Sequence, residues 1–206
     1  MHLVLASASP ARLSVLRAAG VEPVVRVSGV DEDAVAAALV DPKPADLVTA
    51  LAVAKAEAVL PVVAAEHPDA VVIGCDSMLL FDDEVVGKPG TVEVARERWT
   101  RMAGRTGTLL TGHAVLRLRE GEVIGRAAAS EPTTVRFGRP TERELTAYLA
   151  TGEPLAVAGG FTLDGLGGWF IEGVDGDPSS VIGISLPLTR RLLGDVDVSV
   201  LDIWSP

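Results

Sequence analysis

Two charged residues interrupt stretches of this chain that are otherwise apolar. Asp76 follows the apolar segment 70–73, and Lys55 lies among alanine, valine and leucine residues. A carboxylate just beyond a buried strand can hold a divalent cation or polarise a water, but it can equally be an ordinary turn residue. A lysine among alanines can extend its ammonium to the surface or point it into a cleft. Neither residue alone defines a site.

A third candidate is the segment that begins at Ser7. Ser9 has the position of a helix N-cap and Pro10 that of the first helical residue, so a helix is predicted to start there. The unpaired N–H groups of a helix N-terminus bind anions. Arg12 falls in the first turn, where a cation opposes the helix dipole unless an anion is recruited. The alternative is a plain N-cap with a solvated arginine.

Two further charged residues lie in turns. Lys88, in the loop 87–90, is a compact cation suited to a phosphate oxygen, although a solvated loop lysine has the same appearance. Asp82 and Pro89 stand where a P-loop needs glycine and serine or threonine, so a P-loop is excluded. Glu32 belongs to the acidic cluster 31–33, which is either solvated or the source of a second metal ligand.

The remaining reactive residue types give no pattern. His67 and His113 lack the paired spacing of a zinc site. The single cysteine, Cys75, excludes an internal disulfide, is compatible with a reducing cytoplasm, and is interpreted as a small buried side chain.

Bulk composition narrows the class of protein. The formal net charge of −10 argues against general affinity for nucleic acid. No apolar run reaches the length of a membrane span, and the start of the chain lacks the features of a signal peptide. We therefore expect no nucleic-acid or membrane partner and a cytoplasmic location.

The apolar patterns predict an alternation of strands and helices. Predicted strands cover 2–6, 21–27, 70–73, 78–81, 84–86, 109–119 and 123–137. Predicted helices run from Pro10 to Gly20, from about 45 to 60 with Pro61 as its end or kink, over 92–103, from the capping box of Thr141 and Glu144 to about 152, and after Pro187. These elements indicate a mixed α/β fold with a mostly central twisted sheet and helices on both faces. Residues 1–206 are interpreted as one domain with two lobes flanking a cleft.

Taken together, the charged segments follow an order that resembles the Maf family of nucleoside triphosphate pyrophosphatases, which are structurally akin to inosine triphosphatases. The matching segments are 5–12, 29–32, 54–56, 74–77, 87–89, 111–112, 158–160 with 165–168, and 181–188. One such segment would be weak, whereas eight in order across nearly the whole chain are specific.

The resemblance implies a cytoplasmic enzyme, usually a homodimer, that cleaves a nucleoside triphosphate between its α- and β-phosphates. It implies Mg²⁺ or Mn²⁺ as cofactor, held by Asp76 and Glu32. The residues that match catalytic positions are Asp76, Lys55 and Lys88. Those expected to bind substrate are Ser7, Ser9, Arg12, Ser77 and Asp164. The alternative activities are a non-catalytic nucleotide-binding regulator of cell division and a nucleotidyltransferase.

Several positions depart from the family pattern. Ala11, Ser77 and Asp164 stand where many members have Arg, Thr and Gln, residues tied to thymidine and uridine preference. The preferred base is therefore left open, and Asp164 is either a base-reading acceptor or a turn residue. Ala156 and Val157 replace an Asp-Lys pair, so one cation of the family's site is missing.

Overall fold

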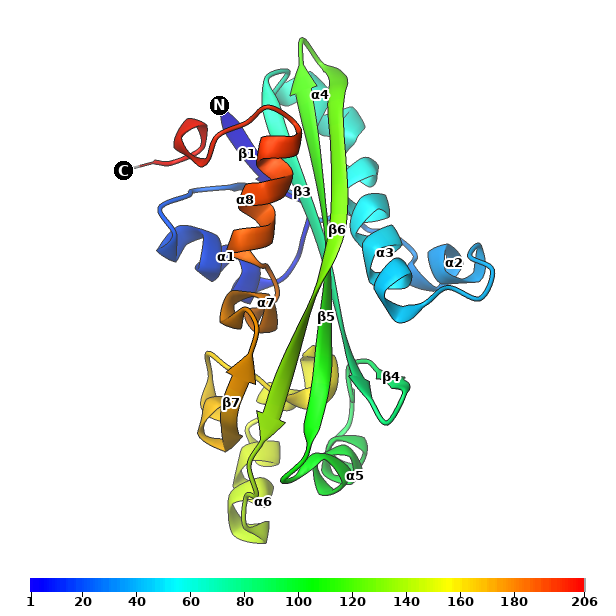
Figure 1. The fold of residues 1–206 in the computed structure, drawn as a ribbon, viewed down its shortest axis with the longest axis vertical. Helices are drawn as coiled ribbons and strands as arrows, with labels where there is room; N and C mark the ends of the chain where they lie inside the picture. The colour runs from blue at the N-terminus through cyan, green and yellow to red at the C-terminus, as the bar shows by residue number, and fades with distance from the viewer. Residues whose placement is uncertain (206) are drawn as a thin grey trace. The chain divides into compact units, whose positions relative to one another are not determined.

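The computed structural model describes residues 1–205, which form helices and strands in alternation over most of their length (Figure 1). The α-helices are α1 Pro10–Ala18, α2 Glu32–Ala37, α3 Pro44–Ala58, α4 Leu60–Glu66, α5 Val92–Met102, α6 Glu142–Ala150, α7 Pro178–Ile182 and α8 Leu186–Asp195. The strands are β1 His2–Leu5, β2 Val24–Val25, β3 Ala70–Phe81, β4 Glu84–Val86, β5 Thr106–Arg119, β6 Glu122–Phe137 and β7 Ile171–Asp175. Short 3₁₀ turns cover Glu153–Ala156, Ala158–Gly160, Leu166–Phe170 and Val200–Asp202.

The strands join in one mixed sheet, in the order β2-β1-β3-β5-β6-β7, with β4 beside β3. The first strands are parallel, because β1 pairs parallel with both β2 and β3, whereas β4 and β7 pair antiparallel. This arrangement confirms the predicted mixed α/β class. Two compact units can be distinguished, one formed by residues 1–76, 111–131 and 183–205, the other by residues 77–110 and 132–182. The assignment of the chain to a single domain stays a prediction.

The first unit is a sheet covered by helices on both faces. Helices α1 and α8 lie on one face and α3 and α4 on the other (Figure 1). Alternation along the strands supplies both cores: Leu3, Leu5 and Ile73 pack with α1 and α8, while Val4, Ala6 and Val72 pack with α3 and α4. The predicted α/β layering is therefore realised in this unit.

Two glycines allow α3 to approach the sheet closely. A Cβ added to Gly74 in β3 would lie 2.1 Å from the carbonyl oxygen of Ala52, and one added to Gly112 in β5 would lie 2.1 Å from that of Val48. Any side chain at either position would therefore push the helix away. The helix that carries Lys55 thus rests directly on the strand that carries Asp76.

The second unit packs around aromatic side chains. Trp99 of α5 is fully buried, makes edge-on contacts with Phe137 and Tyr148, and donates its indole N–H to the carbonyl oxygen of Gly160 over 2.8 Å. Helix α6 begins with the predicted capping box, in which Thr141 and Glu144 exchange hydrogen bonds. This core fixes the segment 158–170 within its unit.

The structure corrects four local predictions. Strand β3 runs without interruption from Ala70 to Phe81, so Asp76 lies inside a strand and not just past its end. Strand β2 is only Val24–Val25, shorter than the predicted 21–27. The acidic turn at 31–33 begins α2, with Asp31 as its N-cap. Helix α7, over Pro178–Ile182, was not predicted.

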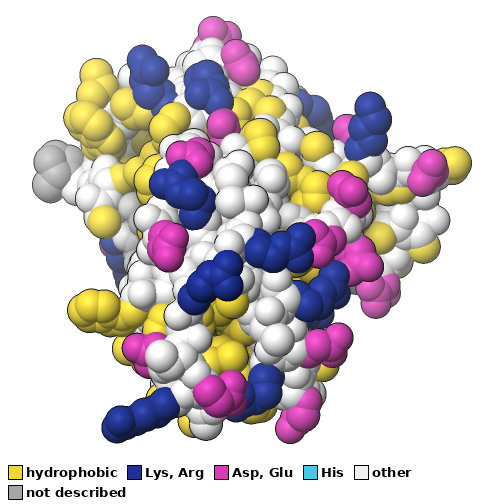
Figure 2. Space-filling model, turned by 60° about the horizontal axis from the view of Figure 1, so that its bottom comes forward, with side chains coloured by type: hydrophobic (Ala, Val, Ile, Leu, Met, Phe, Trp, Pro, Cys, Tyr) yellow, Lys and Arg dark blue, Asp and Glu magenta, His cyan; other side chains and the backbone are white. Residues whose placement is uncertain are grey.

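On the face shown in Figure 2, acidic and basic side chains are interspersed, and no continuous basic surface appears there. Within residues 1–205, no single helix is long and apolar enough to cross a membrane; only the consecutive pair α3 and α4, bent by 42°, reaches that length and composition together.

Candidate functional site

Lys55 and Asp76 form an ion pair in the interior of the first unit. The Nζ of Lys55 donates to Oδ1 of Asp76 over 2.6 Å, and the same nitrogen lies 2.6 Å from Oε1 of Glu32. One ammonium therefore holds two carboxylates that are far apart in the sequence. Three of the charged residues singled out from the sequence are brought together here.

Burial differs sharply among the three side chains. The side chains of Lys55 and Asp76 are 11% and 9% exposed, whereas that of Glu32 is 51% exposed. The alternative in which Lys55 extends to the surface is thereby excluded. Asp76 Oδ2 is buried and has no hydrogen-bond partner within residues 1–205. A buried carboxylate oxygen without a partner is costly, so this atom is suited to a cation or a water molecule.

The position of Asp76 follows from strand alternation. Gly74 faces α3, and Asp76, two residues later, points to the same face of β3. Because Gly74 lets α3 rest on the strand between Ala52 and Ala56, Lys55 on that helix is within reach of the carboxylate. Asp31 caps α2 by accepting from the N–H of Ala34 over 3.0 Å, and this places Glu32 at the first position of that helix.

The segment that begins at Ser7 forms a second polar cluster in this unit. Ser7 Oγ accepts hydrogen bonds from the backbone N–H of Ser9 over 3.1 Å and from an Nη of Arg12 over 3.0 Å. Ser9 is the N-cap of α1, as predicted, and accepts from the backbone N–H of Arg12. The guanidinium of Arg12 is therefore held against the start of its own helix.

Arg12 is also anchored from the far end of the chain. Its Nε donates to the carbonyl oxygen of Gly183 over 2.8 Å. Gly183 has a φ of +129°, and a Cβ there would lie 3.2 Å from Nε of Arg12, so a side chain is disfavoured at this position for two reasons. The alternative of a freely solvated arginine is excluded by these contacts.

Sequence reasoning missed two residues behind this anchor. His113 and Ser185 are fully buried, and Nε2 of His113 accepts from the backbone N–H of Ser185 over 2.8 Å. The one sequence signal for His113 is its position within an apolar predicted strand, and the spacing of the histidines bears only on a zinc site. Gly183 and Ser185 belong to the segment 181–188, which carried part of the family resemblance, but no local pattern assigned either of them a role of its own.

Three predicted site residues, Ser77, Lys88 and Asp164, belong to the second unit. Ser77 is half-buried in β3, and Lys88 and Asp164 are exposed in loops. Lys88 makes no ion pair or hydrogen bond with any residue that the structure describes. The participation of these three residues in the site stays a prediction.

Cys75 has no role as a nucleophile. Its side chain is wholly buried among the apolar residues between β3 and α8. Burial raises the pKa of this thiol to about 11, so the reactive thiolate is scarce at neutral pH. The interpretation of Cys75 as a small core residue is confirmed.

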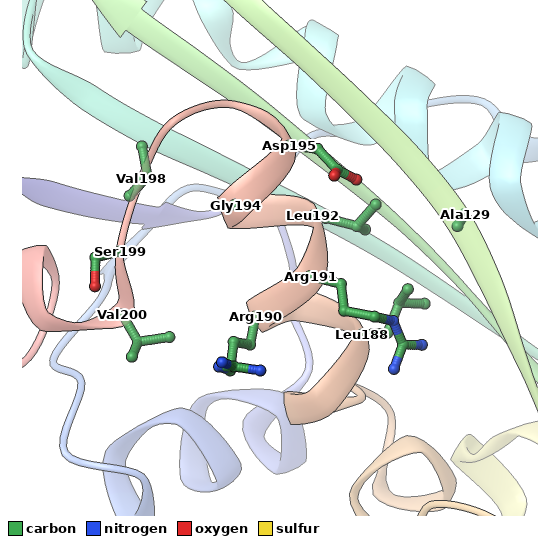
Figure 3. Close-up of a pocket in the computed structure, with 10 residues that line it drawn as sticks. All are labelled: Ala129, Leu188, Arg190, Arg191, Leu192, Gly194, Asp195, Val198, Ser199 and Val200. Carbon is green, nitrogen blue, oxygen red and sulfur yellow. The ribbon is translucent and has the colours of Figure 1, made fainter.

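The first unit has two open grooves, and neither is lined by Lys55 or Asp76. One, of about 630 Å³, lies beside α8 and the segment 198–200, with Arg190 and Arg191 at its rim (Figure 3). Arg191 is paired with Glu131 of β6 over 2.9 Å. The other, of about 600 Å³, lies between α3 and residues 128–130 of β6. Neither groove contains the charged residues of the candidate site.

Comparison of the sequence with known proteins shows its family. The family model of the Maf-like protein matches residues 2–196. A nucleoside triphosphate pyrophosphatase from Saccharopolyspora erythraea is 72% identical over 100% of this chain and 98% of its own length. Proteins of the same name from Rhodococcus opacus and Mycolicibacterium gilvum are 66% and 56% identical, over 98% and 99% of this chain and 95% and 99% of their own lengths. With a match of this extent and the site geometry in place, the chain belongs to the Maf family.

Proposed function

We propose that this protein hydrolyses nucleoside triphosphates between the α- and β-phosphates, releasing a nucleoside monophosphate and pyrophosphate. The observation that carries the proposal is the buried Oδ2 of Asp76, which has no hydrogen-bond partner among the described residues and lies beside the Lys55 ammonium and the Glu32 carboxylate. The names of the relatives support the same activity. The family therefore supplies the reaction class, and the ion-paired cluster supplies groups that can perform it.

A divalent cation fits the same residues. Mg²⁺ and Mn²⁺ prefer oxygen ligands, and Mg²⁺ usually takes one or two carboxylates together with water and substrate phosphates. Within residues 1–205, no group of three or more His, Cys, Asp or Glu residues forms a complete metal cage, so Asp76 and Glu32 would hold a partly hydrated ion. When bound, the metal supplies positive charge to the phosphoryl oxygens.

The protein's own residues then do the remaining work. Asp76 orients the attacking water and accepts its proton as the water oxygen bonds to the α-phosphorus. The bridging P–O bond breaks and pyrophosphate leaves with the electron pair. Lys55 holds Asp76 and Glu32 in one place through its two short contacts. Positioning and electrostatics account for most of the acceleration in such a site.

Phosphate binding is assigned to the cluster at the start of α1. Arg12 is fixed by Ser7 and by the carbonyl oxygen of Gly183, and Ser9 caps the helix whose N-terminal amides favour anions. Lys88, exposed and without an ion pair within the described residues, would add a cation for the phosphates, and Ser77 and Asp164 would contact the nucleoside. The substrate's base is left open by Ala11, Ser77 and Asp164, and we propose clearance of non-standard or surplus nucleotides as the role.

A panel of canonical and modified triphosphates tests the proposal. Each is incubated with Mg²⁺, with Mn²⁺ or with chelator, and products are identified by mass, with Asp76→Asn as control. We expect monophosphate and pyrophosphate with metal only, and neither with the variant. Binding without product would favour the nucleotide-binding regulator. Pyrophosphate release only after an acceptor is added would favour the nucleotidyltransferase.

A cytoplasmic homodimer that binds neither nucleic acid nor membrane completes the proposal. The outer edge of β6 over residues 122–131 has no neighbouring strand in the part of the chain that the structure describes. Its small residues Ala127, Ala128 and Ala129 leave that edge accessible, and an unpaired edge is a template for another strand. Antiparallel pairing of this edge with a second copy is the arrangement we favour. Light scattering should give twice the monomer mass of 21.4 kDa, and Ala128→Pro should lower it.

A further inference from the structure

His113 is a fully buried histidine on β5 that has no part in the reaction described above. Its Nε2 lies 2.8 Å from the backbone nitrogen of Ser185, which can only donate a hydrogen. Its Nδ1 lies 3.0 Å from the carbonyl oxygen of Thr111, which can only accept one. Both partners therefore require the same form of the ring: neutral, with its proton on Nδ1 and a lone pair on Nε2.

Ser185 connects this histidine to the segment that anchors Arg12. Ser185 Oγ accepts from the backbone N–H of Leu188 over 3.1 Å and so caps α8. Two residues earlier, the carbonyl oxygen of Gly183 accepts the hydrogen bond from Nε of Arg12. Residues 183–185 are thus tied to His113 at one end and to Arg12 at the other.

We infer that His113 is a positioning residue for Arg12, and that it acts through the Ser185 N–H and the Gly183 carbonyl oxygen. The inference rests on the proposed function, in which Arg12 binds the phosphates. Without an acceptor at Nε2, the buried N–H of Ser185 would lack its partner, and the segment would have to shift to satisfy it. Because Gly183 is only two residues away, its carbonyl oxygen would move as well and release Nε of Arg12.

Three substitutions of His113 distinguish the hydrogen bond made by Nε2 from the one made by Nδ1. His113→Gln places an amide oxygen near the position of Nε2 and retains an acceptor for Ser185. His113→Asn retains a donor near the position of Nδ1 but is too short to reach Ser185. His113→Leu removes both. The glutamine variant is therefore the conservative replacement, and the asparagine variant is its matched control.

Steady-state kinetics on the best triphosphate provide the first readout. We expect KM to rise by about tenfold in the asparagine and leucine variants, the effect of one lost charge-assisted hydrogen bond, while kcat falls by less than about threefold. The glutamine variant should stay within about threefold of the wild type in both constants. Equal values of KM in all four proteins, or equal losses in the glutamine and asparagine variants, would overturn the inference.

A double-mutant cycle tests whether the effect passes through Arg12. The dissociation constant of a triphosphate analogue with a non-hydrolysable α–β bridge is measured for His113→Asn in the wild-type and Arg12→Ala backgrounds. We expect the asparagine substitution to weaken binding about tenfold in the first background and less than twofold in the second. An undiminished effect in the Arg12→Ala background would show that His113 does not act through that side chain.

The ring nitrogens themselves give a readout that is independent of activity. Nitrogen-15 NMR of the wild type, with its three histidines and His113→Gln for assignment, should show the proton of His113 on Nδ1. A proton on Nε2 would contradict the inference even if the kinetics agreed. If the wild type releases no pyrophosphate from any triphosphate, the proposed function fails, whereas analogue binding and the NMR spectrum still decide the role of His113. The asparagine and glutamine pair also keeps the test valid if the leucine variant does not fold.

Discussion

Asp76 in the first unit is a buried carboxylate and Glu153 in the second is a partly buried one, and they are satisfied in opposite ways. Asp76 receives one hydrogen bond, from Lys55, and its buried Oδ2 has no partner among the described residues. Glu153 accepts from the Thr162 hydroxyl and the Gly167 N–H at one oxygen, and from the Leu166 N–H at the other.

The two carboxylates therefore differ in whether an oxygen is left to bind a ligand. Desolvation alone would raise the pKa of Glu153, but the hydrogen bonds from Thr162, Leu166 and Gly167 together hold it below its usual range. Its lone pairs are used to fix the glycine-rich turn at 165–168. The unused oxygen of Asp76 instead is available for a ligand. A carboxylate that is left incompletely satisfied points to function, and one that is completely satisfied points to structure.

Asp76→Asn should have the largest effect on activity. We expect kcat for pyrophosphate release to fall by about 10³-fold, because the variant loses both the proton acceptor and a metal ligand. Stability to urea should change by less than about 1 kcal/mol, because the amide oxygen of the new side chain can still accept from Lys55, which also keeps its contact with Glu32. Activity near that of the wild type would show that Asp76 has no role in the reaction, and the contrast with Glu153 would fail.

Gly74→Ala should show that the position of Asp76 depends on close packing between helix and strand. The new Cβ would lie 2.1 Å from the carbonyl oxygen of Ala52, and the resulting displacement of α3 should cost about 3 kcal/mol in the free energy of unfolding. Activity should fall too, because Lys55 moves with the helix. Gly194→Ala in α8 is the matched control, since nothing lies within 4 Å of its added Cβ, and it should stabilise by about 0.5–1 kcal/mol.

Glu153→Gln should show the reverse of Asp76→Asn. In the glutamine variant an NH₂ group replaces one of the two carboxylate oxygens. It would face other donors, either those of Thr162 and Gly167 or the N–H of Leu166, so those hydrogen bonds would be lost. We expect a loss of about 2 kcal/mol in the free energy of unfolding, measured in urea. The protein that remains folded should keep a kcat within about threefold of the wild type. A loss of activity without a loss of stability would assign Glu153 to the site instead.

The pH dependence of that stability difference gives the smallest expected effect. Because the hydrogen bonds to Glu153 hold its pKa below its usual range in the folded protein, its contribution to stability is present above the pKa of the unfolded chain and is lost as the pH falls through the folded pKa. The difference between wild type and Glu153→Gln should therefore be constant from pH 7 to about pH 5 and then shrink as the pH falls further. A difference that grows on acidification would contradict the assigned shift.

Local signals in the sequence were sufficient for most elements and for the identity of the charged residues. The N-cap at Ser9, the capping box at Thr141 and the break at Pro61 all lie where they were predicted, because each depends on neighbours within four residues. The acidic turn that became α2 was missed because its apolar face is short and none of its residues is buried.

The break predicted between two strands around Asp76 was wrong for a related reason. A polar residue usually ends a buried strand, but Lys55 pairs with this carboxylate and allows β3 to continue through it.

The sequence by itself determined which residues could do chemistry: Asp76, Glu32, Lys55 and Arg12 are the types that bind metal and phosphate, and their order along the chain shows the family. Only the tertiary structure decided which of them meet. The contact between Lys55 and Asp76 depends on Gly74, and that between Arg12 and Gly183 spans 171 positions in the sequence. Such contacts depend on the register between distant elements, and no local pattern encodes the direction in which a side chain on one element meets another.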